Sequence, residues 1–97
     1  MDDVVYLNDL FDIYGDLLTE RQRTYFKDYY FDNLSYGEIS EKYNISRNAS
    51  FKQLKNVIDK LNELEKNLGI YRKNKIIKEI IDMEKDQNIR NKLEELL

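Results

Sequence analysis

One stretch decides the fold of this chain: Leu34-Ser35-Tyr36-Gly37-Glu38-Ile39-Ser40-Glu41-Lys42-Tyr43-Asn44-Ile45-Ser46-Arg47-Asn48-Ala49. Ser35 followed by Glu38 is a capping box, which predicts the start of a short helix over about residues 36–43. Asn44 tolerates the left-handed backbone of a sharp turn, and Ser46 can cap a second helix. Two capped helices joined by a tight turn are typical of a helix-turn-helix unit.

The residue sizes in this stretch fit that interpretation. We expect Ser40 to be small because the second helix crosses closely there. Apolar side chains must hold the two helices at their angle, and helical spacing extends this apolar set into the neighbouring segments. The spacing predicts one core that contains Ile39, Tyr43, Ile45, Leu54, Ile58, Phe11, Tyr14, Tyr25 and Phe26.

Two helices are predicted before this unit. Apolar residues from Val4 to Tyr14 recur at helical spacing, and Gly15 follows where that helix would end. Thr19 with Gln22 is a second capping box, which starts the next helix. Its aromatic stripe has the spacing of a helix face, which favours core packing over base stacking for Tyr25, Phe26, Tyr29, Tyr30 and Phe31.

Further helices are predicted after the turn. A long one runs from Ser46 to Gly69, and its regular apolar spacing lets its far half pack as a coiled-coil seam. Two shorter helices follow around residues 76–81 and 89–97, with a break near Asp86. The apolar stripes of these last helices and of the long helix predict a homodimer interface.

These elements together predict the architecture. We expect an all-α bundle of five or six helices that forms a single helical domain over residues 1–97. The helix-turn-helix unit occupies about residues 35–62, and a C-terminal helical extension occupies about residues 70–97.

The composition excludes several classes of function. The 97 residues contain no cysteine and no histidine, which removes disulfides, thiol nucleophiles, common zinc sites and the usual general base. Asp2 and Asp3, and the cluster at Asp82, Glu84 and Asp86, lack the glycine-bearing loop of a calcium site. We therefore expect no enzyme, no metal and no cofactor. Apolar runs are too short for membrane insertion and no secretory segment is visible, which favours a cytoplasmic protein.

Charge is unevenly distributed along the chain. Residues 1–46 carry ten acids and four bases, a net charge of −6, whereas residues 47–97 carry nine acids and twelve bases, a net charge of +3. A wholly acidic protein would repel nucleic acid, but this chain has an acidic half and a basic half. The charge therefore leaves a nucleic-acid partner open.

The first candidate site lies at the start of the long helix. Arg47, Asn48, Lys52 and Lys55 would face the major groove if this helix is a recognition helix, because Arg and Asn can each make bidentate contacts to bases. The alternative is an ordinary solvated helix face. Phe51 in the same segment is either an anchor for a protein partner or a side chain buried against its own chain.

A second basic patch follows the long helix. It comprises Arg72, Lys73, Lys75 and Lys78, and it could bind phosphate or an RNA backbone. The alternative is a solvated patch, because Glu79 and Asp82 lie close by in the sequence.

Residues 17–62 resemble region four of bacterial sigma factors. That region opens with a leucine-threonine-x-x-glutamine motif, which is matched here by Leu18-Thr19-Glu20-Arg21-Gln22. Two positions depart from the pattern: Ser50 stands where an apolar residue is usual, and Phe51 stands where a polar residue is usual.

The whole chain resembles the YlxM-like family of small bacterial helix-turn-helix proteins. The residues that carry this resemblance are Leu10-Phe11-Asp12-Ile13-Tyr14, Tyr29-Tyr30, Ile45-Ser46-Arg47 and Leu68-Gly69-Ile70-Tyr71. Genes of this family typically lie beside those of the signal recognition particle. The resemblance therefore implies a regulatory or accessory role connected to co-translational protein targeting.

Two mechanisms remain open. In the first, the chain is a transcriptional regulator that binds DNA as a dimer through its recognition helix. Alternatively, the helix-turn-helix docks on the protein or RNA of the signal recognition particle, or on its GTPase. The departures at Ser50 and Phe51 favour docking, and so does the acidic first half, which duplex DNA would repel.

Overall fold

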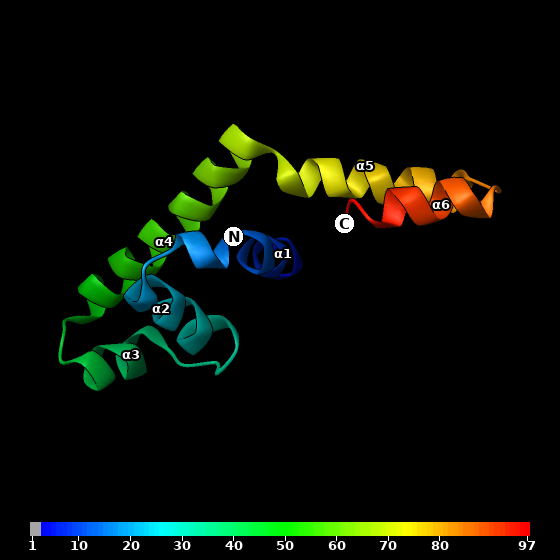
Figure 1. Cartoon of the computed structure of the whole chain (residues 1–97). Coiled ribbons are helices and arrows are strands. Elements are labelled where there is room, and N and C mark those ends of the chain that lie inside the picture. Colours follow the sequence, from blue (N-terminus) through cyan, green and yellow to red (C-terminus); the bar gives the residue numbers. More distant parts are fainter. Residues whose placement is uncertain (1–2) are drawn as a thin grey trace.

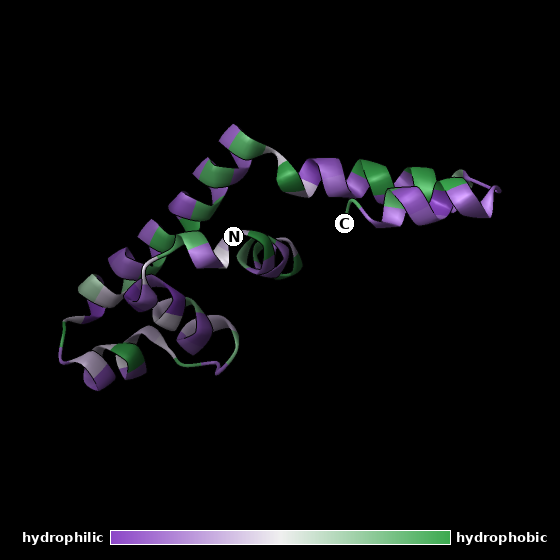
Figure 2. Cartoon of the chain, in the orientation of Figure 1, coloured by the Kyte–Doolittle hydropathy of each residue, from purple (hydrophilic) through white to green (hydrophobic). Residues whose placement is uncertain are grey.

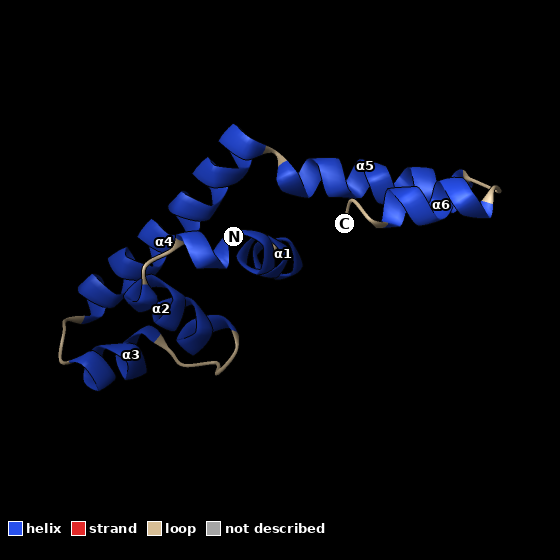
Figure 3. Ribbon diagram, in the orientation of Figure 1, coloured by secondary structure: helices blue, strands red, loops and turns tan. Residues whose placement is uncertain are grey.

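The computed structural model describes residues 3–97; Met1 and Asp2 lie outside the described residues, and with them one member of the acidic pair Asp2 and Asp3 considered above. Within that range every regular element is helical, as Figure 3 shows, so the all-α prediction is confirmed. The elements are α1 (Val4–Tyr14), the 3-10 turn η1 (Gly15–Leu17), α2 (Glu20–Tyr30), α3 (Tyr36–Tyr43), α4 (Arg47–Leu68), α5 (Ile70–Met83) and α6 (Gln87–Glu94).

Helices α1 to α4 begin and end where the local sequence predicts, whereas α5 is longer than the predicted 76–81 at both ends and α6 ends before the predicted 97. Thr19 and Ser35 each form a complete capping box, and the Ser46 hydroxyl accepts a hydrogen bond from the Ala49 amide. Asn44 closes α3 with φ of 53°, and Gly69 closes α4 with φ of 64°. Both residues adopt the left-handed backbone that ends a helix sharply.

The main core lies between α1, α2 and α4. Leu7, Leu10 and Tyr14 of α1 are fully buried, and they pack with Phe26 of α2 and with Val57 and Leu61 of α4. Helix α4 runs across the molecule and contacts α1, α2 and α3 (Figure 1). Helix α4 is therefore both the central element of the core and the second helix of the helix-turn-helix.

A second buried group lies where α3 packs on α4. Ile39 is 1% exposed and Leu54 is 2% exposed, as the helix-turn-helix interpretation requires. Phe11, Tyr14 and Phe26 belong instead to the main core, with Ile58 at its edge. The single core that spacing predicts is thus divided into two neighbouring groups, because the main contacts of α3 are with α4 and α2.

The aromatic stripe of α2 is covered only on one side. Tyr25 and Phe26 are buried, and Tyr29 and Tyr30 are half-buried. Phe31 is 48% exposed, and its ring makes T-shaped contacts with those of Phe11 and Phe26 at centroid distances of 5.8 and 5.9 Å. Phe31 therefore packs at the rim of the main core and stays about half exposed, because it follows the last residue of α2.

The last two helices form a hairpin that we call the arm. The start of α5 contacts α1, and the rest projects away from the other helices with α6 folded back along it (Figure 1). The molecule is consequently elongated, 56 × 24 × 23 Å. Figure 2 shows hydrophobic residues at intervals along α5, although Ile81 is the one buried side chain that α5 contributes among the described residues.

A hydrogen-bond network fixes the elbow between α4 and the arm. The Tyr14 hydroxyl donates to Glu65 Oε1 at 2.6 Å and accepts from the Ile70 amide at 3.1 Å. The Glu65 carboxylate also accepts from the amides of Tyr71 and Arg72. Because Gly69 has no side chain to cap α5, Glu65 of the preceding helix satisfies the free amides of its first turn.

Candidate interface on the recognition helix

The position of α3 is set by a clamp from α2. Asp28 is 3% exposed, and its carboxylate accepts from Lys42 Nζ at 2.9 Å and from the Tyr43 hydroxyl at 2.6 Å. The hydrogen bond to Asp28 raises the pKa of Lys42, and burial followed by the hydrogen bond to Asp28 raises the pKa of Tyr43. A buried carboxylate with two donors ties the end of α3 to α2.

The crossing of α3 and α4 is built on two small residues. Ser50 is 1% exposed, and its hydroxyl lies 2.8 Å from the carbonyl oxygens of both Tyr36 and Arg47. A Cβ on Gly37 would lie 3.2 Å from Arg47 Nη2, so Arg47 leans back over the start of α3. Ser40, which we expected at the crossing, is half-buried and donates to the Gly37 carbonyl within its own helix.

Three of the predicted site residues share the outward face of α4. Asn48, Lys52 and Lys55 are exposed, and their spacing of four and three residues places them in one row along the helix. Lys55 Nζ lies 3.0 Å from Asp59 Oδ2 in an exposed pair, so part of its charge is compensated. Over residues 47–60 the helix carries four bases and one acid, a local net charge of +3.

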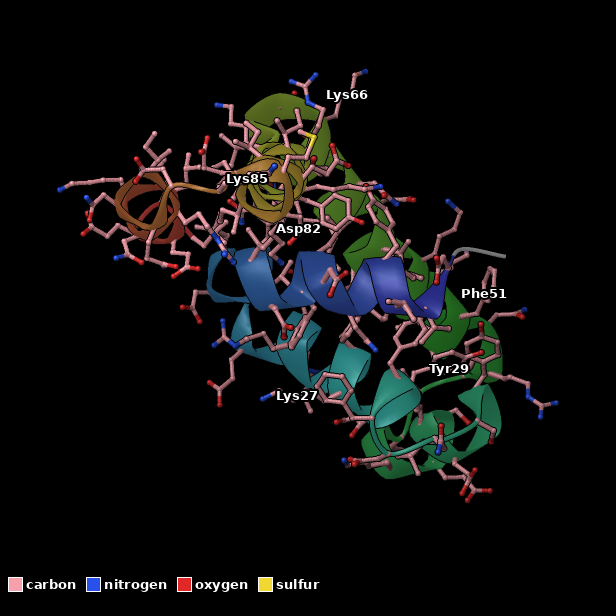
Figure 4. All side chains as sticks on the ribbon, turned by 90° about the vertical axis from the view of Figure 1, so that its right-hand side faces the viewer. Lys27, Tyr29, Phe51, Lys66, Asp82 and Lys85 are labelled. Carbon is pink, nitrogen blue, oxygen red and sulfur yellow. The ribbon has the colours of Figure 1, made fainter. Side chains whose placement is uncertain are left out.

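Phe51 lies beside this row and is 47% exposed. Its ring meets the Tyr36 ring edge-on at a centroid distance of 5.5 Å, and Tyr36 stacks on Tyr29 at 5.0 Å with an interplanar angle of 12°. We call these three residues the aromatic ladder; Figure 4 labels Tyr29 and Phe51 on the same side of the molecule. The hydrogen bond between the side chains of Tyr29 and Tyr36, with burial, raises the pKa of Tyr36 to about 12.

Sequence reasoning did not identify Tyr29 and Tyr36 as part of the site. Tyr36 directly follows the N-cap Ser35 and is therefore the first residue of α3. Because α3 packs on α4, a side chain at this position can reach α4. This placement is visible in the sequence. The stacking of Tyr29 on Tyr36 is not, because it depends on the path of the chain between α2 and α3.

The second basic patch is distributed around α5. Lys75 and Lys78 line a cleft of about 280 Å³ between α1 and α5, opposite Asp9 and Asp12. Arg72 lies at the elbow, where its Nη2 would be 3.7 Å from a Cβ on Gly69. Lys73 is exposed on another side of the helix. The four cations therefore do not form one continuous face.

Two properties of the described chain bear on other functions. None of the helices in residues 3–97 has both the length and the apolar character needed to cross a bilayer. The same residues contain no group of three or more acidic, histidine or cysteine side chains arranged to hold a metal ion.

Comparison with known proteins assigns the family. All 97 residues match the family model of helix-turn-helix proteins described as "YlxM / p13 like". A UPF0122 protein of Shouchella clausii is 41% identical over 73 residues, which cover 75% of this chain and 67% of the relative. A UPF0122 protein of Halalkalibacterium halodurans is 38% identical over 86 residues, which cover 89% and 79%. The resemblance found in the sequence is thus confirmed, and the chain belongs to the YlxM / p13-like family of helix-turn-helix proteins.

Proposed function

We propose that this chain is a non-enzymatic regulatory or accessory protein that acts in the cytoplasm, by docking the first turns of α4 onto the signal recognition particle. The choice of this partner rests on the family resemblance, since genes of YlxM-like proteins typically lie beside those of the particle. The residues that would make the contact are Phe51, Lys52, Lys55, Asn48 and Arg47. Lys75 and Lys78 are available for a secondary contact with phosphate.

The observation that carries this proposal is the exposure of Phe51. A phenylalanine that is 47% exposed between cationic and amide side chains is a typical interface anchor, because aromatic residues dominate binding energy at interfaces. The Tyr36 ring contacts Phe51 from one side and is itself stacked on Tyr29, which reduces the side-chain freedom that binding would cost. Basic residues around the ring suit an acidic protein surface or looped RNA, whose bases stack on aromatic side chains.

The test is a binding titration with three ligands: the particle RNA, the targeting GTPase and duplex DNA. Changing Phe51 to Ala should weaken binding of one particle component by about 10-fold or more, while the salt dependence stays small. Unchanged binding of all three ligands would contradict docking through α4.

The second candidate function is transcriptional regulation through DNA binding. It is favoured by the exposed row of Asn48, Lys52 and Lys55, because residues near the start of a recognition helix contact base edges in the major groove. In that case changing Arg47 or Lys52 to Ala should weaken DNA binding and lower the salt slope by about one for each lost phosphate contact. An unaltered salt slope in both variants would exclude this mode.

We also propose that the chain is a homodimer. Large apolar side chains remain exposed from the end of α4 to the C-terminus, including Leu68, Ile76, Ile80, Met83, Ile89, Leu96 and Leu97. Sedimentation at tens of micromolar protein tests this proposal, and a monomer there would contradict it.

A further inference from the structure

The arm buries too little apolar surface to account for its own order. Among residues 70–97, Ile81 is the buried apolar side chain of α5, and α6 contributes none. Helix α6 has 8 residues, and isolated helices of that length are marginal in water, so most of their stability must come from packing. The arm therefore needs a second surface to cover it.

The uncovered surface is a stripe along α5. Ile76 is 48% exposed, Ile80 39% and Met83 74%, and their spacing of four and three residues aligns them on one side of the helix. Lys75 and Lys78 point to a different side, where they line the cleft against α1. The stripe is thus free of contact with the main core.

Charge is segregated along the same helix. Residues 72–78 carry the four bases Arg72, Lys73, Lys75 and Lys78 and no acid. Residues 79–86 carry the four acids Glu79, Asp82, Glu84 and Asp86 and one base, Lys85. The arm is basic near the elbow and acidic at its tip.

We infer that the stripe is covered by the arm of a second copy of this chain, with the two α5 helices antiparallel about a two-fold axis. In this arrangement the basic half of each α5 faces the acidic half of the other, and the exposed isoleucines meet near the axis. A parallel pairing would set the basic half of each α5 against the basic half of the other, which opposes association. This inference rests on the proposed homodimer and is independent of the ligand that α4 binds.

The first experiment reverses charge in the full-length chain. R72E/K73E lowers the net charge of residues 72–78 from +4 to 0, and E79K/D82K raises the net charge of residues 79–86 from −3 to +1. Glu79 and Asp82 are chosen because Glu84 and Asp86 accept backbone hydrogen bonds at the α5–α6 turn. Each variant alone should dimerise with a dissociation constant raised by about 10-fold or more, and an equimolar mixture should restore association. K27E/K66E, which changes the net charge by −4 as R72E/K73E does but at exposed sites outside the arm, is the matched control for that variant.

The second experiment determines orientation. The chain has no cysteine, so K73C and M83C each introduce a single thiol. These positions are about 15 Å apart along one helix. A short bis-maleimide should link K73C chains to M83C chains more efficiently than it links either variant to itself.

The outcomes separate the possible failures. A wild-type monomer in sedimentation would overturn both the homodimer and the arm pairing. A dimer that is as strong in both charge variants as in K27E/K66E, or that prefers same-site cross-links, would overturn the antiparallel arm and leave the homodimer standing.

Discussion

The Tyr14 hydroxyl donates a 2.6 Å hydrogen bond to the Glu65 carboxylate, and this contact joins α1 to the end of α4 directly beneath the elbow. The same hydroxyl accepts the Ile70 amide, while Glu65 accepts the next two amides of α5. The direction of the arm is therefore fixed by a polar network anchored in the main core, since the Tyr14 side chain is fully buried. Loss of the hydroxyl should free the elbow without emptying the core.

Changing Tyr14 to Phe tests this relationship. The variant keeps the ring and loses both hydrogen bonds, so the free energy of unfolding should fall by about 1–2 kcal/mol. Hydrogen exchange should become faster at the amides of Ile70, Tyr71 and Arg72, because the capping of α5 is weakened. Exchange that increases uniformly over the chain would instead indicate a general loss of stability.

The crossing of α3 and α4 should depend on the size of Ser50. Replacement by Ala removes the hydroxyl that lies between the carbonyls of Tyr36 and Arg47, and should lower the free energy of unfolding by about 1 kcal/mol. Replacement by Leu, the apolar type usual in sigma factors, should destabilise by about 1–3 kcal/mol because the site is already filled. Urea denaturation of both variants measures this, and a more stable Leu variant would contradict the close crossing.

The clamp at Asp28 should stabilise α3. In the Asp28→Ala variant the Tyr43 hydroxyl and Lys42 Nζ lose their shared acceptor, and the free energy of unfolding should fall by about 2 kcal/mol. Asp28→Asn retains an acceptor oxygen and should lose less. Equal losses in the two variants, measured by thermal and urea unfolding, would mean that the carboxylate oxygens are not what holds α3.

Alkaline pH should disrupt the aromatic ladder only above the pH at which an ordinary tyrosine ionises. The pKa of Tyr36 is raised from its usual 10.0 to about 12, chiefly by the hydrogen bond with Tyr29 and then by burial. Because the pKa in the folded chain exceeds that in the unfolded chain, this stabilisation is complete below about pH 10 and is lost as the pH rises through about 12. The pKa of Tyr43 is raised as well, so phenolate absorbance should show more than one tyrosine that titrates late, and Tyr29→Phe should bring one of these titrations to lower pH. If as many tyrosines titrate late in Tyr29→Phe as in the wild type, Tyr29 is not the cause of the raised pKa of Tyr36.

Local features of the fold could be predicted from the sequence, because caps and turns are encoded within a few residues. The capping boxes at Thr19 and Ser35 and the left-handed Asn44 and Gly69 are such cases. The exposure of individual side chains could not be predicted in the same way. Phe31 and Phe51 are both large aromatics next to a helical pattern, and both are about half exposed, because coverage depends on which helix the chain brings over them.

The candidate site could be predicted only in part, because some of its features also depend on contacts between segments. The exposed row of Asn48, Lys52 and Lys55 follows from helix periodicity once α4 is placed. Ser50 looked like a departure from the sigma pattern, whereas its hydroxyl finds an acceptor on α3 that only the tertiary crossing supplies. The stacking of Tyr29 on Tyr36 and the uncovered stripe on α5 likewise arise from contacts between segments, which spacing along one segment does not contain.

Binding through the first turns of α4 is tested most directly by paired aromatic variants. Phe51 and Phe31 are 47% and 48% exposed, so Phe31→Ala is a matched control on a different surface. Titration of wild type, Phe51→Ala and Phe31→Ala against the particle RNA, the targeting GTPase and duplex DNA should show about a 10-fold or greater loss for Phe51→Ala alone, with at least one ligand. Equal affinities of Phe51→Ala and Phe31→Ala for every ligand would contradict binding through α4.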